Sequence, residues 1–116
     1  MRSIITDNLE ICYICGSTSN IELHHCIHGT PENRKLATKH HIVVGLCSEC
    51  HRGLNGVHGS NGDPLDLRLK SDAQEAWIRR KLSKKEIKDY HHGVRKWVEI
   101  FGTDFTHEYI KMKNSL

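Results

Sequence analysis

A chain of 116 residues is long enough for one domain with a modest core, and only 6% of its residues are aromatic. A core of that size is usually reinforced by a metal or by disulfides. The N-terminal segment lacks the apolar run of a signal peptide or membrane span, so we expect a cytoplasmic protein with no membrane partner. In a reducing compartment, five cysteines favour metal binding over disulfides.

The first half of the sequence predicts a compact loop, two strands and a short helix. Residues 11–16 read ICYICG, two cysteines three apart followed by a turn glycine, which is typical of a zinc knuckle. Residues 21–24 alternate apolar and polar and predict a strand, residues 28–41 are polar and predict a long loop, and residues 42–46 predict a second strand. A short helix should follow with Ser48 as its N-cap, and the glycines of residues 53–62 then predict a turn-rich loop.

From residue 65 onward the pattern is helical. Residues 71–74 (SDAQ) and 83–86 (SKKE) match the sequence pattern of a capping box, and each precedes an apolar run. Gly102 should end the second of these helices, and residues 104–113 predict a last short one. We therefore expect an α+β fold, with residues 1–62 forming a metal-stabilised core and residues 63–116 a helical extension packed on or beside it within a single domain.

Four of the cysteines form two Cys-x-x-Cys pairs, Cys12 with Cys15 and Cys47 with Cys50. Each pair can span one edge of a tetrahedron, which suits Zn²⁺. Four thiolates can also bind iron, so the ligands by themselves leave an iron site as an alternative. A four-thiolate site leaves no coordination position for a substrate. The predicted ion is therefore a structural zinc.

Binding both cysteine pairs to one ion would bring their neighbours together. His24 and His25 end the first predicted strand, and His51 directly follows Cys50. Adjacent strand residues point to opposite faces, so His24 and His25 should have different roles. We expect a second site built from His24, His25 and His51.

These residues resemble a known family. The Cys-x-x-Cys pair, then Leu23-His24-His25, then the segment LCSECHR at residues 46–52 look like the HNH endonucleases that embed a ββα-metal core, a treble-clef-like His-Me finger, between two zinc-binding cysteine pairs. The resemblance covers residues 12–58. The segments HRG at 51–53 and GVHG at 56–59, with the helical tail and its Gly102, are also similar to phage recombination-enhancement nucleases of the HNH class.

The resemblance implies a metal-dependent endonuclease that hydrolyses DNA phosphodiester bonds, with a role in phage or bacterial recombination or DNA processing. His24 and His51 would bind a catalytic divalent ion, Mg²⁺ or Mn²⁺, with Ni²⁺ or Zn²⁺ as alternatives at an imidazole-rich site. His25 would be the general base. The products would carry a 5′-phosphate and a 3′-hydroxyl.

Three positions around this motif remain open. His58 lies seven residues beyond His51, about 10.5 Å along an unbroken helix, so it can reach the same ion only if Gly53 and Gly56 fold the chain back. Asn55 is the competing candidate, although we favour His58. The family usually has Asn where this chain has Ile42, and His41 or its neighbour His40 could support the base instead.

The basic residues suggest a polyanionic partner, DNA. Residues 68–116 hold twelve Lys and Arg against seven Asp and Glu, whereas residues 1–67 hold five against seven. The predicted DNA contacts are Arg52, Arg79, Arg80, Lys81, Lys84 and Lys85. A recombinase or another phage protein is a further candidate partner. The alternatives are a catalytically inactive zinc-scaffolded module that binds nucleic acid and, less favoured, a structural zinc protein that binds a protein partner.

Overall fold

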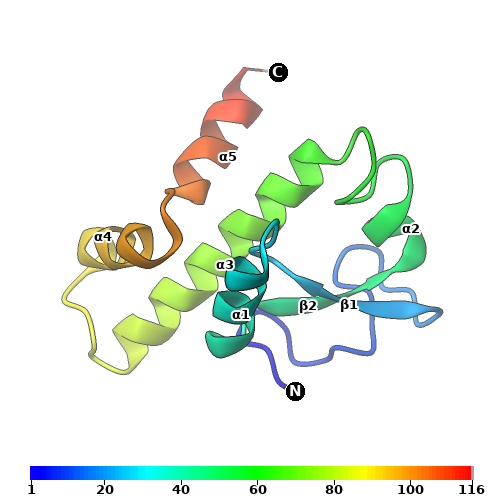
Figure 1. Cartoon of the computed structure of the whole chain (residues 1–116). Helices are drawn as coiled ribbons and strands as arrows, with labels where there is room; N and C mark the ends of the chain where they lie inside the picture. The colour runs from blue at the N-terminus through cyan, green and yellow to red at the C-terminus, as the bar shows by residue number, and fades with distance from the viewer. Residues whose placement is uncertain (116) are drawn as a thin grey trace.

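The computed structural model describes residues 1–115 and confirms the predicted α+β class. In this part of the chain, two strands form one sheet and the remaining elements are five helices (Figure 1). In chain order the elements are β1 (Ile21–His25), α1 (Pro31–Lys39), β2 (Val43–Cys47), α2 (Ser48–Arg52), α3 (Asp63–Ser83), α4 (Tyr90–Phe101) and α5 (Phe105–Asn114).

The two strands are antiparallel, and both predicted strands are confirmed to within one residue. Ile21 pairs with Cys47 at one end of the ladder and His25 with Val43 at the other. All five residues of β2 are buried. Gly45 is required there, because a side chain would collide with the carbonyl oxygen of Leu9 in the N-terminal segment.

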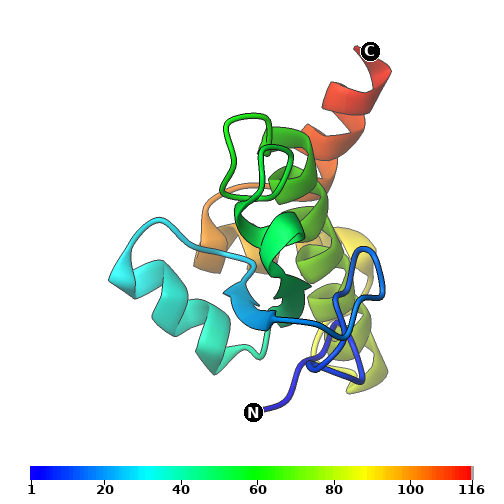
Figure 2. The ribbon, with the colours of Figure 1, turned by 90° about the vertical axis from the view of Figure 1, so that its right-hand side faces the viewer.

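The long loop predicted over residues 28–41 is wrong, because most of that segment is helix α1. The Thr30 side chain accepts a hydrogen bond from the backbone N–H of Asn33 at 3.1 Å, and Pro31 occupies the first turn. Ala37 is fully buried on the inner face. Viewed from the side, α1 (cyan) projects beside the two strands (Figure 2).

The predicted short helix at residue 48 is confirmed as α2, but its N-cap is Cys47 rather than Ser48. The Cys47 sulfur accepts a hydrogen bond from the Cys50 backbone N–H at 3.4 Å. A thiolate at this position would also be favoured by the partial positive charge at the start of the helix.

Both predicted capping boxes are wrong. Ser71 is buried inside α3, where its hydroxyl donates to Thr106 Oγ1 at 3.1 Å, and Ser83 is the last residue of α3. The next helix, α4, begins after Asp89, whose side chain caps the N–H of His92. Gly102 ends α4 with φ of +88°, as predicted, and α5 matches the predicted last helix.

One hydrophobic cluster joins the two predicted parts of the chain. It contains Ile42, Val44 and Leu46 from the sheet region together with Leu69 and Trp77 from α3. Helices α4 and α5 pack on the far side of α3 (Figure 1). Within the described residues, no helix has the length and apolar character needed to cross a membrane.

Candidate functional site

The four paired cysteines lie together, as predicted from their spacing. The sulfur atoms of Cys12, Cys15, Cys47 and Cys50 all lie within 4.8 Å of one another. The sulfurs of Cys15 and Cys47 are 3.7 Å apart, although these residues are 32 positions apart in the chain. This cluster could hold a metal ion, and tetrahedral thiolate ligands are the usual arrangement for such a group.

The backbone around the cluster favours the thiolate form of one cysteine. Burial acts to raise the pKa of Cys12, but N–H groups of Cys15, Cys47 and Ile14 outweigh it and lower that pKa to about 6. Burial and the neighbouring thiols raise the pKa of Cys50 instead. Four adjacent thiolates repel one another, and a divalent cation between them would remove that repulsion.

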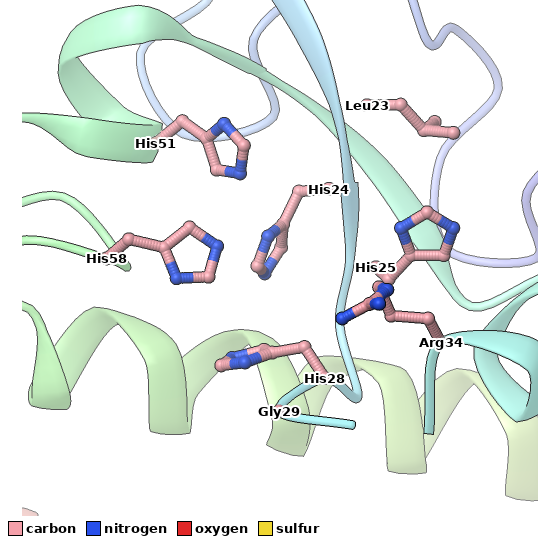
Figure 3. Close-up of a pocket in the computed structure, with 8 residues that line it drawn as sticks. All are labelled: Leu23, His24, His25, His28, Gly29, Arg34, His51 and His58. Atoms are coloured by element: carbon pink, nitrogen blue, oxygen red, sulfur yellow. The ribbon is translucent and has the colours of Figure 1, made fainter. Parts of the chain in front are cut away.

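A second cluster contains histidines from β1, α2 and the loop after α2. Ligand nitrogens of His24, His51 and His58 all lie within 4.8 Å of one another. The ring centroid of His24 is 5.2 Å from that of His51 and 5.3 Å from that of His58. Figure 3 shows the three rings converging on one side of β1. His58, and not Asn55, therefore joins the two other predicted ligands.

The loop of residues 53–62 brings His58 back to His51. The backbone N–H of His58 donates to the carbonyl of His51 at 3.0 Å, and Val57 N–H donates to that of Cys50 at 2.9 Å. The loop is so tightly wound that a side chain at Gly59 would overlap the Gly53 carbonyl oxygen. The glycines of this segment are therefore what allows His58 to reach the cluster.

His24 is the most buried member of this group. It is only 1% exposed, and its Nε2 atom has no hydrogen-bond partner among the described residues. Burial and the neighbouring imidazoles lower the pKa of His24 to about 3, so the ring is neutral at physiological pH. A buried, neutral and unpartnered imidazole nitrogen is a good metal ligand, and it is costly to bury without one.

A carboxylate fixes the orientation of His51. Glu22 Oε1 lies 2.8 Å from His51 Nδ1, and the other oxygen of Glu22 pairs with Arg52. Because a carboxylate can only accept, His51 carries its proton on Nδ1 and leaves Nε2 free to bind a metal. Glu22 is two residues from His24 and therefore lies on the same face of β1, a signal that sequence reasoning missed.

Two more residues were missed. His28, in the loop after β1, and Asp66, in the first turn of α3, form a second candidate group with His24. His28 Nε2 lies 2.7 Å from Asp66 Oδ1, and Asp66 also pairs with Lys70 at 3.0 Å. The His28 ring is 4.9 Å from that of His58, so the two groups adjoin. No local pattern links His28 to Asp66, because α3 brings them together only in the folded chain.

His25 lies on the opposite side of β1 from His24, as strand alternation requires (Figure 3). Both residues nevertheless line one hollow of about 460 Å³, together with His28, Arg34, His51 and His58. Burial and the charge of Arg34 lower the pKa of His25 below its ordinary value, so its ring is neutral at neutral pH.

The histidines expected to support His25 as a general base have other hydrogen-bond partners. Ile42 is fully buried in the core. His40 Nδ1 accepts a hydrogen bond from the Trp77 indole at 3.3 Å, and the backbone carbonyl of His41 accepts one from Ile4. Within residues 1–115, neither histidine hydrogen-bonds to His25, and neither lines the hollow.

The predicted DNA-contacting residues fall into two sets. Arg52 pairs with Glu22, and Lys81 pairs with Glu86 at 2.7 Å. Arg79, Arg80 and Lys84 line a separate hollow near the C-terminal end of α3, and Lys85 is exposed just beyond it. None of them lines the histidine hollow.

Comparisons with protein-family models, with curated proteins and with solved structures found no match to this chain. The interpretation of the site therefore depends on its own geometry and chemistry.

Proposed function

We propose that this protein is a metal-dependent endonuclease of the HNH class that hydrolyses phosphodiester bonds in DNA. The observation that carries the proposal is the convergence of three imidazoles around the buried, unpartnered Nε2 of His24, beside a hollow also lined by His25 and Arg34. A ligand set next to a neutral base and a cation is the combination that hydrolysis of a phosphate ester requires.

The four-cysteine cluster is assigned a structural Zn²⁺ ion. Its thiolates leave no open position for substrate, and they connect the N-terminal loop to the start of α2. In this role the ion would fix Cys50 and so help to hold the adjacent His51 against the face of β1 that carries His24 and Glu22.

The histidine cluster is assigned the catalytic divalent ion. Its ligands would be His24, His51 and His58. Imidazole ligands favour Ni²⁺ or Zn²⁺, whereas Mg²⁺ and Mn²⁺ prefer oxygen and would take water and phosphate oxygens as their other ligands. When bound, such an ion neutralises phosphate charge and stabilises the leaving oxygen.

The chain's own residues perform the proton transfer. His25 accepts a proton from the attacking water, the new P–O bond forms, and the bond to the 3′ oxygen breaks. The leaving oxygen takes a proton from solvent, which yields a 5′-phosphate and a 3′-hydroxyl. Burial and the nearby positive charge of Arg34 both lower the pKa of His25, so the ring is unprotonated before reaction.

A second function, a zinc-scaffolded module that binds nucleic acid without cutting it, is favoured by one observation. The family's Asn is replaced by Ile42, which is buried in the core, and neither His40 nor His41 hydrogen-bonds to His25 within residues 1–115. On this alternative, DNA is retained with a steep salt dependence and no strand is cut.

Plasmid cleavage distinguishes the two functions. We expect supercoiled DNA to be converted to open circles or linear DNA when Mn²⁺ or Mg²⁺ is added, and His25→Ala to abolish the conversion. His107→Ala is the matched control, because His107 is exposed on α5. A fully active His25→Ala protein, or a folded, zinc-loaded wild type that cuts no DNA with any divalent ion, would contradict the nuclease.

A further inference from the structure

The outer face of α1 forms a basic groove that opens beside the histidine hollow. The groove, of about 500 Å³, is lined by His25, Pro31, Arg34, Lys35, Thr38 and Lys39. Three of these side chains are cationic and none is acidic. Counted from Pro31, its helical residues lie at positions i, i+3, i+4, i+7 and i+8, so they share one face of the helix.

This groove adjoins the histidine hollow. His25 and Arg34 line both of them, so a DNA strand lying in the groove can continue directly into the hollow. Arg34 and Lys39 are five residues apart, about 7.5 Å along the helix axis. That rise corresponds to about two nucleotides of one DNA strand.

The cations of the groove are free to bind a ligand. Arg34, Lys35 and Lys39 are exposed, and within residues 1–115 none of them forms a salt bridge. By contrast, Arg52 and Lys81 each already pair with a carboxylate. Unpaired cations on one face attract a polyanion and lose little when they bind it.

Helix α1 is held in a fixed position relative to the histidines. At its start, Asn33 Nδ2 donates to the His28 carbonyl at 2.9 Å, and just beyond its end Ile42 N–H donates to the Ala37 carbonyl at 3.0 Å. The buried Ala37 packs its inner face on the core. The groove is therefore preorganised, which limits the entropy lost on binding.

We infer that this groove binds the backbone of the DNA strand whose phosphate lies at the histidine site, through Arg34, Lys35 and Lys39. The inference rests on the proposed function and adds to it the path of the substrate. The other basic hollow, at Arg79, Arg80 and Lys84, lies at the opposite end of α3. Arg80 is 14 residues beyond Asp66, about 21 Å along the helix.

The test compares two triple variants that each remove three positive charges. One carries Arg34→Gln, Lys35→Gln and Lys39→Gln, and its control carries Arg79→Gln, Arg80→Gln and Lys84→Gln. Gln keeps most of the side-chain length and is a good helix former. Zinc content and circular dichroism establish that both variants are folded.

Binding of a fluorescein-labelled DNA duplex is measured by anisotropy between about 50 and about 200 mM salt, without added divalent ion. We expect the groove variant to lose at least about tenfold in affinity and to reduce the salt slope by about 2 to 3, since each lost phosphate contact removes about 0.9. The control should lose clearly less.

Groove-variant affinity equal to wild type, or an equal loss in both variants, would overturn this inference while leaving the nuclease untouched. If the wild type binds DNA through the groove but never cuts it, the proposed nuclease activity is wrong and the proposed DNA-binding role of the groove is supported. A folded wild type that binds no DNA at low salt would overturn both.

Discussion

The contact between Glu22 and His51 gives the sharpest test of the histidine centre. Glu22 Oε1 lies 2.8 Å from His51 Nδ1, so Glu22→Ala removes the group that holds the imidazole with Nε2 facing His24 and His58. Glu22→Gln keeps an oxygen that can accept from Nδ1 but removes its charge. The two substitutions therefore separate orientation from charge.

The size of the effect follows from the role of a carboxylate behind a metal-binding histidine. Loss of such a partner typically weakens metal binding by about 10- to 100-fold. We expect Glu22→Ala to lie in this range and Glu22→Gln to fall between it and wild type. The cysteine cluster includes neither Glu22 nor His51, so the zinc content of the protein should not change.

Isothermal titration of zinc-loaded protein with Mn²⁺ or Ni²⁺ measures this difference directly. Glu108→Ala, an exposed carboxylate on α5, is the matched control. Arg52→Ala is a second control, because it removes the other partner of Glu22 and leaves the contact with His51 in place. If Glu22→Ala binds the added ion as tightly as wild type, the assignment of His51 as a ligand oriented by Glu22 is wrong.

Three further predictions concern the same region. Cys50→Ser should release the Zn²⁺ proposed for the cysteine cluster and unfold the chain, because structural zinc sites contribute about 10–16 kcal/mol against a typical total stability of about 5–15 kcal/mol; zinc analysis and circular dichroism measure both. Gly59→Ala should force the loop away from the Gly53 carbonyl and weaken ion binding at the histidines, measured by titration, while zinc stays bound. The cleavage rate should rise with pH through the lowered pKa of His25 and level off above it, since the base acts when neutral. Arg34→Gln should move this limb to higher pH by removing a repelling charge.

Different results would contradict each of these predictions. A Cys50→Ser protein with full zinc content and unchanged melting would exclude a folding role for the ion. Unchanged ion affinity in Gly59→Ala would show that the loop does not position His58. A cleavage rate that falls as pH rises through 6 to 7, or an acid limb unmoved by Arg34→Gln, would show that His25 is not the base.

The sequence determined those features that depend on neighbouring residues. Alternating and β-branched patterns located both strands, two Cys-x-x-Cys pairs located the thiolate cluster, and Gly102 marked the end of a helix. Such signals follow from periodicity, ligand spacing and backbone freedom, which are properties of a few adjacent residues. Thr30 and Pro31 carry the same kind of signal for α1, but the polar composition of residues 28–41 favours a loop and conceals it.

Tertiary structure decided which residues share the site. Ser71 begins a capping-box sequence pattern, yet it lies buried against α5 inside a long helix, because tertiary packing outweighs local propensity. His28 meets Asp66 only because α3 crosses beside the sheet, and His58 joins His51 only because the glycine loop folds back. Spacing along the chain could predict that the cysteines and histidines gather, but only the packing of separate elements could determine that Glu22, His28, Arg34 and Asp66 lie around the histidines. The physical reason is that contacts between distant segments depend on how the whole core packs, which no local pattern encodes.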